Sequence, residues 1–222
     1  MTNESCATPG PERTDRPAQS VDEYIAELKA NLAQNPTCGN TLYNLGCALL
    51  HKGEWMDAEV AFREAVSNSP GLAEAYIQLG GIAMQRGDLD GCLNYNQIAA
   101  NTRPRFAPAW GNIGFVHMQR GEAKEAVKAL EKAIKYNARF IQAMTTMGSA
   151  FLALSEPDLC LEICGKAVEL EPGFGPAYNN MALAWMDKGD FDKAVECVDK
   201  AQATGFEVNP GLLAELEPHR KA

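Results

Sequence analysis

The sequence repeats with a period of 34 residues from Gly39 onward, without insertions. The period divides the chain into five units, which are residues 39–72, 73–106, 107–140, 141–174 and 175–208. Small residues recur at fixed places in these units, first at Gly46, Gly80, Gly114, Gly148 and Ala182, then at Ala58, Cys92, Ala126, Cys160 and Ala194, and again at Ala65, Ala99, Ala133, Ala167 and Ala201. Self-similarity at a period of roughly 20 to 50 residues is typical of repeat proteins, whose units bury their apolar faces against one another. The chain is therefore expected to fold as an array of similar units.

Each unit has the pattern of two helices joined by a tight turn. In the third unit, one face of the first helix is formed by residues with the spacing i, i+3, i+4, i+7, namely Trp110, Ile113, Gly114 and His117. A second glycine series predicts where this first helix ends, at Gly53, Gly87, Gly121 and Gly189, with Ser155 in the fourth unit. Ala126, Leu130 and Ala133 then carry the apolar stripe of a second helix. One such hairpin cannot bury both stripes, but stacked neighbours can.

The pattern resembles the tetratricopeptide repeat, a helix–turn–helix unit of this length with similar small, aromatic and proline landmarks. Good copies are AEAYIQLGGIAMQRGDLDGCLNY (residues 73–95) and APAWGNIGFVHMQRGEAKEAVKALEKAI (residues 107–134). The resemblance implies an all-α fold, a right-handed α-solenoid of about twelve helices with one continuous core. The fold alone does not name a function, because it serves many partners.

Both ends of the repeat array carry signals for capping helices. Ser20 and Glu23 form a capping-box pattern, which predicts an N-terminal capping helix within residues 20–36, the remnant of a degraded unit. Asn209 and Pro210 begin residues 209–222, expected to hold a C-terminal capping helix and tail. Three leucines could cover the last repeat: Leu212, Leu213 and Leu216. Residues 1–19, with three prolines, are expected to be a disordered tail.

Composition argues against several classes of function. The formal net charge of −9 and pI near 4.9 disfavour binding to nucleic acids or anionic membranes, because both repel an acidic protein. No apolar run is long enough to span a membrane, and the first residues lack a Sec-type signal. Seven cysteines without a C-x-x-C motif favour reduced thiols over a disulfide framework. A cytoplasmic protein without a cofactor is expected.

Residues that could carry chemistry have simpler explanations in the repeat. The glycines of residues 111–121 follow no strand and precede no Lys-Ser/Thr pair, so they do not predict a phosphate loop. His117 lies on the core face, where a packed, hydrogen-bonded histidine is expected rather than a metal ligand. Cys160 and Cys164 share a helix face and could form half of a metal or redox site, but both occupy core positions where cysteine serves as a small hydrophobe. Cys6, in the tail, is expected to be the most reactive thiol.

The face of the first helices that lines the groove in this family carries a series of amides. One register holds Asn44, Gln78, Asn112, Thr146 and Asn180, with Gln119 and Asn179 beside it, among other amides. Apolar neighbours on this face include Tyr43, Ile77 and Phe115, and one methionine register holds Met84, Met118 and Met186. Some tetratricopeptide grooves hold an extended peptide backbone with such amides, which offer both a donor and an acceptor. Methionine suits adaptable recognition. The alternatives are a merely solvated polar face and methionines that belong to the core.

The charges of this face indicate which partners fit. The family's clamp for chaperone tails uses lysines, asparagines and an arginine to bind a terminal carboxylate, but no basic residue occupies the corresponding places in any three consecutive units. Binding of the acidic tails of Hsp70 or Hsp90 is therefore not expected. Glu74 and Asp187 are the only charges that we place in the groove, so a neutral or mildly basic, partly apolar segment is the expected partner.

The sequence as a whole favours a non-catalytic protein-interaction module, which would be an adaptor, a scaffold or an assembly factor such as a co-chaperone. No nucleophile–base pair or cofactor motif stands out from the repeat pattern. One alternative is a homo-oligomeric scaffold formed by end-to-end or groove association. A second is a thiol- or metal-responsive protein that uses Cys160 and Cys164.

Overall fold

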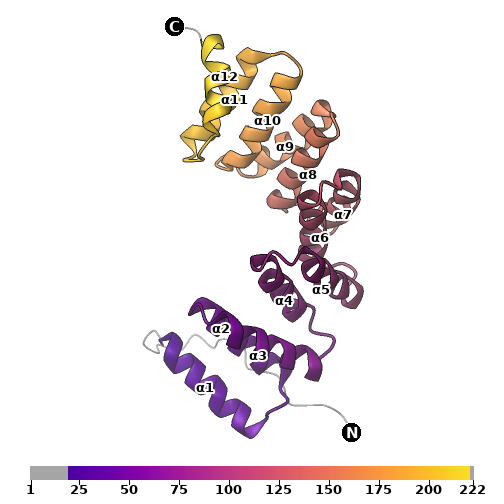
Figure 1. The fold of residues 1–222 in the computed structure, drawn as a ribbon, viewed down its shortest axis with the longest axis vertical. Helices are drawn as coiled ribbons and strands as arrows, with labels where there is room; N and C mark the ends of the chain where they lie inside the picture. The colour runs from indigo at the N-terminus through magenta and orange to yellow at the C-terminus, as the bar shows by residue number, and fades with distance from the viewer. Residues whose placement is uncertain (1–19, 221–222) are drawn as a thin grey trace. The chain divides into compact units, whose positions relative to one another are not determined.

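The structure, a computed structural model, describes residues 20–220, and every regular element in that range is a helix (Figure 1). The helices are α1 (Val21–Gln34), α2 (Gly39–His51), α3 (Trp55–Asn68), α4 (Ala73–Gln85), α5 (Leu89–Thr102), α6 (Ala107–Gln119), α7 (Ala123–Tyr136), α8 (Ile141–Ala153), α9 (Pro157–Leu170), α10 (Gly175–Asp187), α11 (Phe191–Ala203) and α12 (Pro210–Leu216), followed by the short 3-10 helix Glu217–His219. The prediction of an all-α solenoid of helix–turn–helix repeats is confirmed.

The turn between the two helices of each unit requires a left-handed backbone. Gly53, Gly87, Gly121 and Gly189 have φ values of 81°, 74°, 74° and 75°. Glycine adopts this conformation without steric cost because it lacks a Cβ. Ser155 has a φ of 59° at the same place in the fourth unit. The turn geometry is therefore kept even where the residue is not glycine.

Close approach of the paired helices explains the first glycine series. A Cβ atom added to Gly46 would lie 2.6 Å from Phe62 Cε1, and one added to Gly114 would lie 2.5 Å from Leu130 Cγ. Both distances are shorter than a van der Waals contact. The small residue in the first helix thus makes room for the large buried residue of the second.

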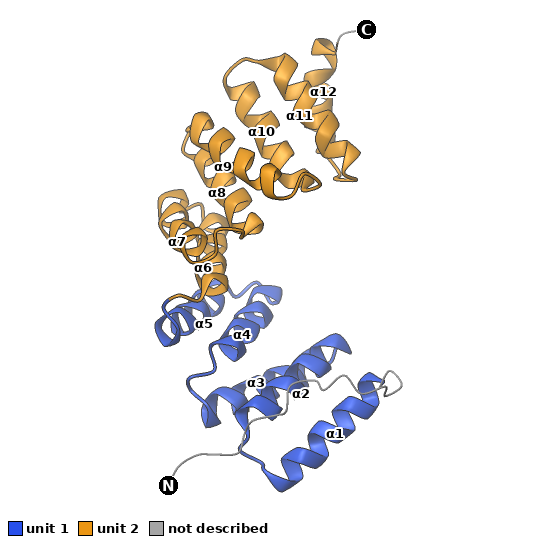
Figure 2. Cartoon of the chain, turned by 180° about the vertical axis from the view of Figure 1, so that it is seen from behind, with its two compact units in different colours: residues 1–104 blue, residues 105–222 orange. Residues whose placement is uncertain are grey.

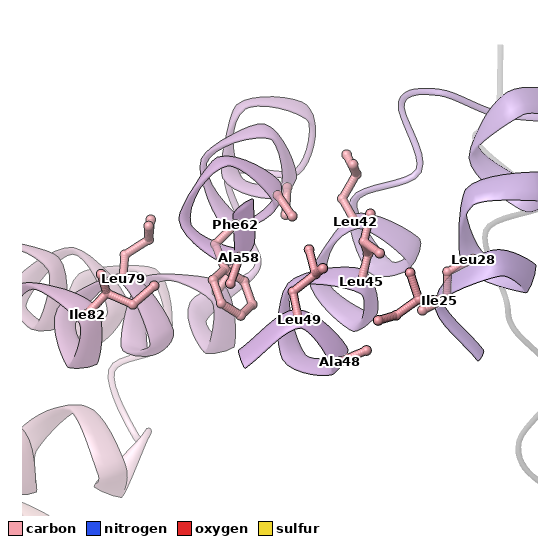
Figure 3. Close-up of a cluster of buried hydrophobic side chains, with 13 residues drawn as sticks. Ile25, Leu28, Leu42, Leu45, Ala48, Leu49, Ala58, Phe62, Leu79 and Ile82 are labelled. Carbon is pink, nitrogen blue, oxygen red and sulfur yellow. The ribbon is translucent and has the colours of Figure 1, made fainter. Parts of the chain in front are cut away.

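The chain divides into two compact units, residues 1–104 (unit 1) and residues 105–222 (unit 2), instead of the single continuous core that we expected (Figure 2). In unit 1, one cluster of buried side chains joins α1 to α4, and Phe62 is fully buried within it (Figure 3). In unit 2, buried clusters centre on Leu130, on the pair Cys160 and Cys164, and on Val198.

A helix lies at each end of the described repeat array, α1 before the first repeat and α12 after the last. At α1, the Ser20 hydroxyl accepts a hydrogen bond from the Glu23 backbone N–H at 3.2 Å, and the Glu23 carboxylate accepts one from the Ser20 N–H at 2.9 Å. At α12, the Asn209 side chain accepts a hydrogen bond from the Gly211 N–H at 2.7 Å. Leu216 is fully buried against the last repeat. The expected N-terminal tail lies outside the described residues.

Candidate partner-binding faces

In unit 1, the structure brings together two residues of the predicted groove, Tyr43 on α2 and Gln78 on α4. Gln78 hydrogen-bonds to the Tyr43 hydroxyl, which also interacts with Cys47. The Tyr43 ring packs near Phe62, with the ring centroids 5.8 Å apart. Burial is the main reason why the pKa of Tyr43 rises to about 12. The predicted residues Asn44, Ile77 and Met84 are half-buried on the same two helices.

In unit 2, α6 presents an apolar and polar face around Phe115. Phe115 is 42% exposed, which is unusual for a phenylalanine, and Gln119 is exposed one turn further along. Asn112 and Met118 lie on the same side of α6 and are half-buried, and Met118 packs partly on the Leu130 cluster. This helix carries the most accessible part of the predicted site.

The remaining residues predicted for unit 2 lie on α8 and α10 and are less accessible. Thr146 is half-buried and donates a hydrogen bond to the Gln142 carbonyl of its own helix at 2.8 Å. Asn179 and Met186 are also half-buried, and Met186 packs partly against the Val198 cluster. Met118 and Met186 are therefore partly packed into the core, and only part of each side chain is available at the surface.

Asn180 does not fit the predicted role, because it is buried with only 7% of its surface exposed. Its side-chain N–H group donates to the Thr145 carbonyl and to the Ser149 hydroxyl, both at 2.9 Å. The hydrogen-bond partner that distinguishes this unit is on the neighbouring first helix, α8. There, Ser149 supplies a hydroxyl group at a register that the other units fill with Cys47, Gly81, Phe115 and Leu183. The Asn180 amide therefore joins α10 to α8, as Gln78 joins α4 to α2.

The candidate chemical residues occupy structural positions. Cys160 and Cys164 are fully buried, with sulfur atoms 4.0 Å apart. The neighbouring thiol and burial raise the pKa of Cys160, which disfavours the reactive thiolate. His117 Nδ1 lies 2.6 Å from a carboxylate oxygen of Glu122, as expected for a hydrogen-bonded histidine. Within residues 20–220, no three His, Cys, Asp or Glu side chains are grouped as a metal site would require.

The remaining cysteines only partly follow the expectation of reduced thiols. Five cysteines are not part of a disulfide, and these are Cys47, Cys92, Cys160, Cys164 and Cys197. Cys38 departs from the expectation, because it is disulfide-bonded. Cys6, predicted to be the most reactive thiol, lies outside the described residues.

The charge expected from Glu74 is largely compensated. Arg103, in the turn after α5, donates two hydrogen bonds to the Glu74 carboxylate, at 2.6 Å and 3.1 Å. Asp187 is exposed at the end of α10. The sequence did not reveal the Arg103 contact, because the two residues are separated by a whole helix.

An exposed apolar patch on α3 was missed by the sequence analysis. It consists of Trp55, Met56 and Val60, whose exposed fractions are 44%, 77% and 54%. In the other units, the place of Met56 holds Asp90, Lys124, Asp158 and Asp192, and the place of Val60 holds Asn94, Lys128, Glu162 and Glu196. A comparison of registers on the outer side of the second helices would have found this patch.

A cleft between α1 and α2 was also missed. It has a volume of about 300 Å³ and is lined mainly by apolar surface from Val21, Tyr24, Asn44, Cys47, Ala48 and His51. The residues with polar groups in this lining include Asn44, which the sequence assigned to the groove, and His51. The six lining residues come from two helices, so the pattern of one repeat position along the sequence could not predict the cleft.

Comparison with known proteins assigns the family. Models of the tetratricopeptide repeat match residues 14–91, 107–140 and 175–203. The chain belongs to the tetratricopeptide repeat family. No curated protein matches it in sequence. No helix among the described residues of this repeat protein is both long and apolar enough to cross a membrane.

Several solved structures share the tetratricopeptide fold. MamA is 25% identical, with a TM-score of 0.65 over 72% of this chain and 94% of MamA. YrrB, described as a TPR protein with an unusual peptide-binding site, is 18% identical, with a TM-score of 0.71 over 87% of this chain and 99% of YrrB. The pilF protein of Pseudomonas aeruginosa is 19% identical, with a TM-score of 0.73 over 84% of this chain and 86% of pilF.

Proposed function

We propose that this protein is a non-catalytic adaptor or scaffold that binds a segment of a partner protein on the first-helix face of its repeats. The observation that carries the proposal is the exposed Phe115 on α6, flanked by Asn112, Met118 and Gln119. An exposed aromatic ring beside amides can bury a large apolar area and still hydrogen-bond to a peptide backbone. Aromatic residues of this kind carry much of the binding energy at protein interfaces.

The partner segment is proposed to be neutral or mildly basic and partly apolar. The net charge of −9 favours approach of a cationic segment and disfavours an acidic one. Within unit 1, Arg103 already compensates the charge of Glu74, so apolar and amide contacts would set the preference for a partner segment there. The acidic chaperone tails stay excluded from the proposal, because the face lacks the basic residues that they require.

The proposed contacts in unit 1 are Tyr43, Asn44, Ile77, Gln78 and Met84. Those in unit 2 are Asn112, Phe115, Met118, Gln119, Thr146, Asn179 and Met186. Asn180 is left out because its amide is engaged inside the unit. A cytoplasmic location remains part of the proposal and rests on the five cysteines that are not disulfide-bonded, which are typical of a reducing compartment.

The test is selection of displayed random peptides with the wild-type chain, followed by affinity measurement against two variants. Phe115→Ala should weaken binding of the selected peptides about tenfold or more, as loss of an aromatic anchor does. Tyr136→Ala is the matched control, because Tyr136 is a similarly exposed aromatic residue on α7. Selected peptides should be poor in Asp and Glu.

Two results would count against the proposal. Equal binding to wild type and to Phe115→Ala would exclude the α6 face as the binding site. Enrichment of acidic peptides would contradict the proposed preference for neutral or mildly basic segments. Light scattering of the full chain addresses the homo-oligomeric alternative, which requires a mass larger than that of one chain and a dependence of that mass on concentration.

A further inference from the structure

We propose that two copies of this chain associate through the second helices α7 and α9 of unit 2, so that the basic side of α7 in each copy lies against the acidic side of α9 in the other. The inference goes beyond the function proposed above, because it assigns the exposed sides of α7 and α9 (the outer face of unit 2) and leaves α6 free for a partner segment. It also differs from end-to-end and groove association, since neither an end of the array nor the groove takes part. It rests on the charges of these two helices, on the partners that the charges lack and on a glycine of α9.

Helices α7 and α9 carry opposite charges. Helix α7 has four lysines and two glutamates, a formal charge of +2, and it is the only positively charged helix in the described part of the chain. Helix α9 has three acidic residues and one lysine, a formal charge of −2. The overall charge of −9 does not reveal this difference. Unit 2 therefore has one basic and one acidic surface on consecutive second helices.

The charged residues of the two helices match position by position. Three lysines of α7 and three acidic residues of α9 occupy the same repeat positions, 34 residues apart: Lys124, Lys128 and Lys135 on α7, and Asp158, Glu162 and Glu169 on α9. All six residues are exposed. Within each helix, their i, i+4, i+11 spacing places them on one side, because a helical turn has 3.6 residues. An acidic face with the same spacing as the basic face is thus present on the chain itself.

The lysines of α7 are available to an acidic group of another molecule. Neither Lys124 nor Lys135 forms an ion pair with another described residue. Lys128 has a long contact of 3.9 Å to Glu125, and its side chain is 75% exposed. Lys124 also lies in the first turn of α7, where the helix dipole disfavours a cation, and α5, α9 and α11 have aspartate at this position. The stability of α7 therefore does not account for Lys124.

The acidic residues of α9 are accessible as well. Glu169 forms no ion pair with another described residue. Asp158 and Glu162 pair with Lys188 and Lys166 of their own chain, but their side chains remain 80% and 61% exposed. Exposed ion pairs of this kind contribute little to stability, so they can rearrange when a second cation approaches. The proposal therefore depends most on Glu169 and on its unpaired counterpart in α7.

Gly165 leaves room for another helix on the acidic side of α9. A Cβ atom added to Gly165 would have no neighbour within 4 Å, so no contact within the described residues requires a glycine there. Glycine in a helix interior is less favourable than alanine. The equivalent residue of α7 is Glu131, an acidic residue on the same side as the lysines. When equivalent positions of two copies face each other, Glu131 meets a glycine and not a carboxylate.

The arrangement of unit 2 allows both charged contacts to form at once. The first helices α6, α8 and α10 contact one another in order, and α7 and α9 both pack against α8. The second helices thus form a separate row beside the first helices. A two-fold axis parallel to this row places α7 of each copy against α9 of the other and keeps equivalent positions level. Such an interface uses both charged faces and closes at a dimer.

A second copy fits this surface better than other anionic partners. The basic side is confined to one helix, and α9 presents carboxylates at the equivalent positions. A nucleic acid or an anionic membrane extends beyond one helix and would meet these carboxylates, which repel it. A second copy offers an acidic face with the required spacing and a glycine opposite Glu131.

Sedimentation velocity of the full chain, measured over a range of protein and salt concentrations, tests the proposal. We expect a dimer whose dissociation constant rises with ionic strength, because salt screens exposed charges. Lys135→Glu and Glu169→Lys should each raise the dissociation constant about tenfold or more, since each places like charges opposite one another. A mixture of these two variants should dimerise again, because both contacts between them then join opposite charges.

Matched controls separate this surface from the overall charge and from the binding of a partner segment. Lys29→Glu makes the same change of charge at an exposed position of α1 and should leave the dissociation constant nearly unchanged. Gly165→Leu should weaken the dimer by filling the space on α9, while the chain stays folded because the added side chain meets no neighbour. Phe115→Ala should dimerise like wild type, so failure of this inference is distinguishable from failure of the proposed function. Circular dichroism melting establishes that each variant is folded.

Three outcomes would overturn the proposal. The first is a monomer at every protein concentration in low salt. The second is a dimer that Lys135→Glu and Glu169→Lys leave unchanged, or a mixture of these variants that stays monomeric, since the contact then lies elsewhere. The third is a monomer whose binding to a duplex oligonucleotide or to anionic vesicles is abolished by Lys135→Glu, which would assign the basic side of α7 to a nucleic acid or a membrane.

Discussion

Asn96 in unit 1 and Leu130 in unit 2 occupy the same position of consecutive repeats, and both are fully buried. In unit 2, this position is apolar throughout, with Leu130, Cys164 and Val198. In unit 1, Phe62 occupies this position in the first repeat and Asn96 occupies it in the second. The Asn96 side chain donates a hydrogen bond to the Cys92 carbonyl at 2.8 Å. The core position that is apolar in every repeat of unit 2 is therefore polar in one repeat of unit 1.

The surfaces of the two units differ as well. On α3 of unit 1, three exposed apolar side chains form one patch, whereas the exposed large apolar residues Phe115, Tyr136 and Leu159 of unit 2 lie on three different helices. Among the described residues, unit 1 also has the cleft between α1 and α2, while α12 covers the last repeat of unit 2. The same repeat pattern therefore carries an entirely apolar core position in unit 2, and a polar core residue together with a patch of exposed apolar side chains in unit 1.

The largest expected effect comes from giving unit 2 the polar core residue of unit 1. Leu130→Asn should lower the free energy of unfolding by about 3 kcal/mol, because it leaves a cavity and buries an amide. Hydrogen exchange with mass spectrometry should show faster exchange in α6 and α7. The control is Leu159→Asn on the exposed side of α9, which should change stability by less than about 0.5 kcal/mol. Equal effects of the two substitutions would contradict the comparison.

The closed end of unit 2 should depend on α12. Leu216 is fully buried, so Leu216→Ala should cost about 2 to 3 kcal/mol and increase exchange in α11 and α12. Glu215→Ala, at an exposed neighbouring position, is the control. If protection of α11 is the same in Leu216→Ala and wild type, α12 does not stabilise the last repeat.

The reciprocal change should strengthen unit 1. Asn96→Leu is expected to raise the free energy of unfolding by about 1 kcal/mol, because a leucine fits beside Gly80 as Leu130 fits beside Gly114. Urea denaturation and the exchange rates of α4 and α5 measure the change. A destabilised variant would show that the amide contacts of Asn96 are worth more than apolar packing at this position.

The smallest expected effect is a pH dependence in unit 1. The pKa of Tyr43 is about 12 in the folded chain, above its ordinary value of 10.0. The unfolded chain therefore loses this proton first, and stability falls as pH rises from 10 towards 12. Because Tyr43 remains partly in contact with solvent, the loss should be at most about 1 kcal/mol. Tyr43→Phe should remove this part of the pH dependence in urea titrations, and identical pH profiles would refute the assignment.

Much of the fold could be predicted because its determinants are local. The glycines of the turns need a positive φ, and the Ser20–Glu23 capping box involves two residues one turn apart. The site was less predictable, because its determinants lie on different helices. Asn180 was assigned to the surface since its register is polar, but its amide hydrogen-bonds to Ser149, which lies 31 residues earlier on another helix. The Glu74–Arg103 pair and the cleft beside α1 likewise depend on packing between elements.

Ser155 illustrates a further property of the repeat array. Its left-handed backbone costs a non-glycine residue about 1 kcal/mol, yet the turn has nearly the geometry of its glycine counterparts. The flanking helices thus dictate the shape of the connection, and the array tolerates an unfavourable residue there. A residue that is unfavourable for the turn itself therefore leaves the helix–turn–helix shape of its repeat intact.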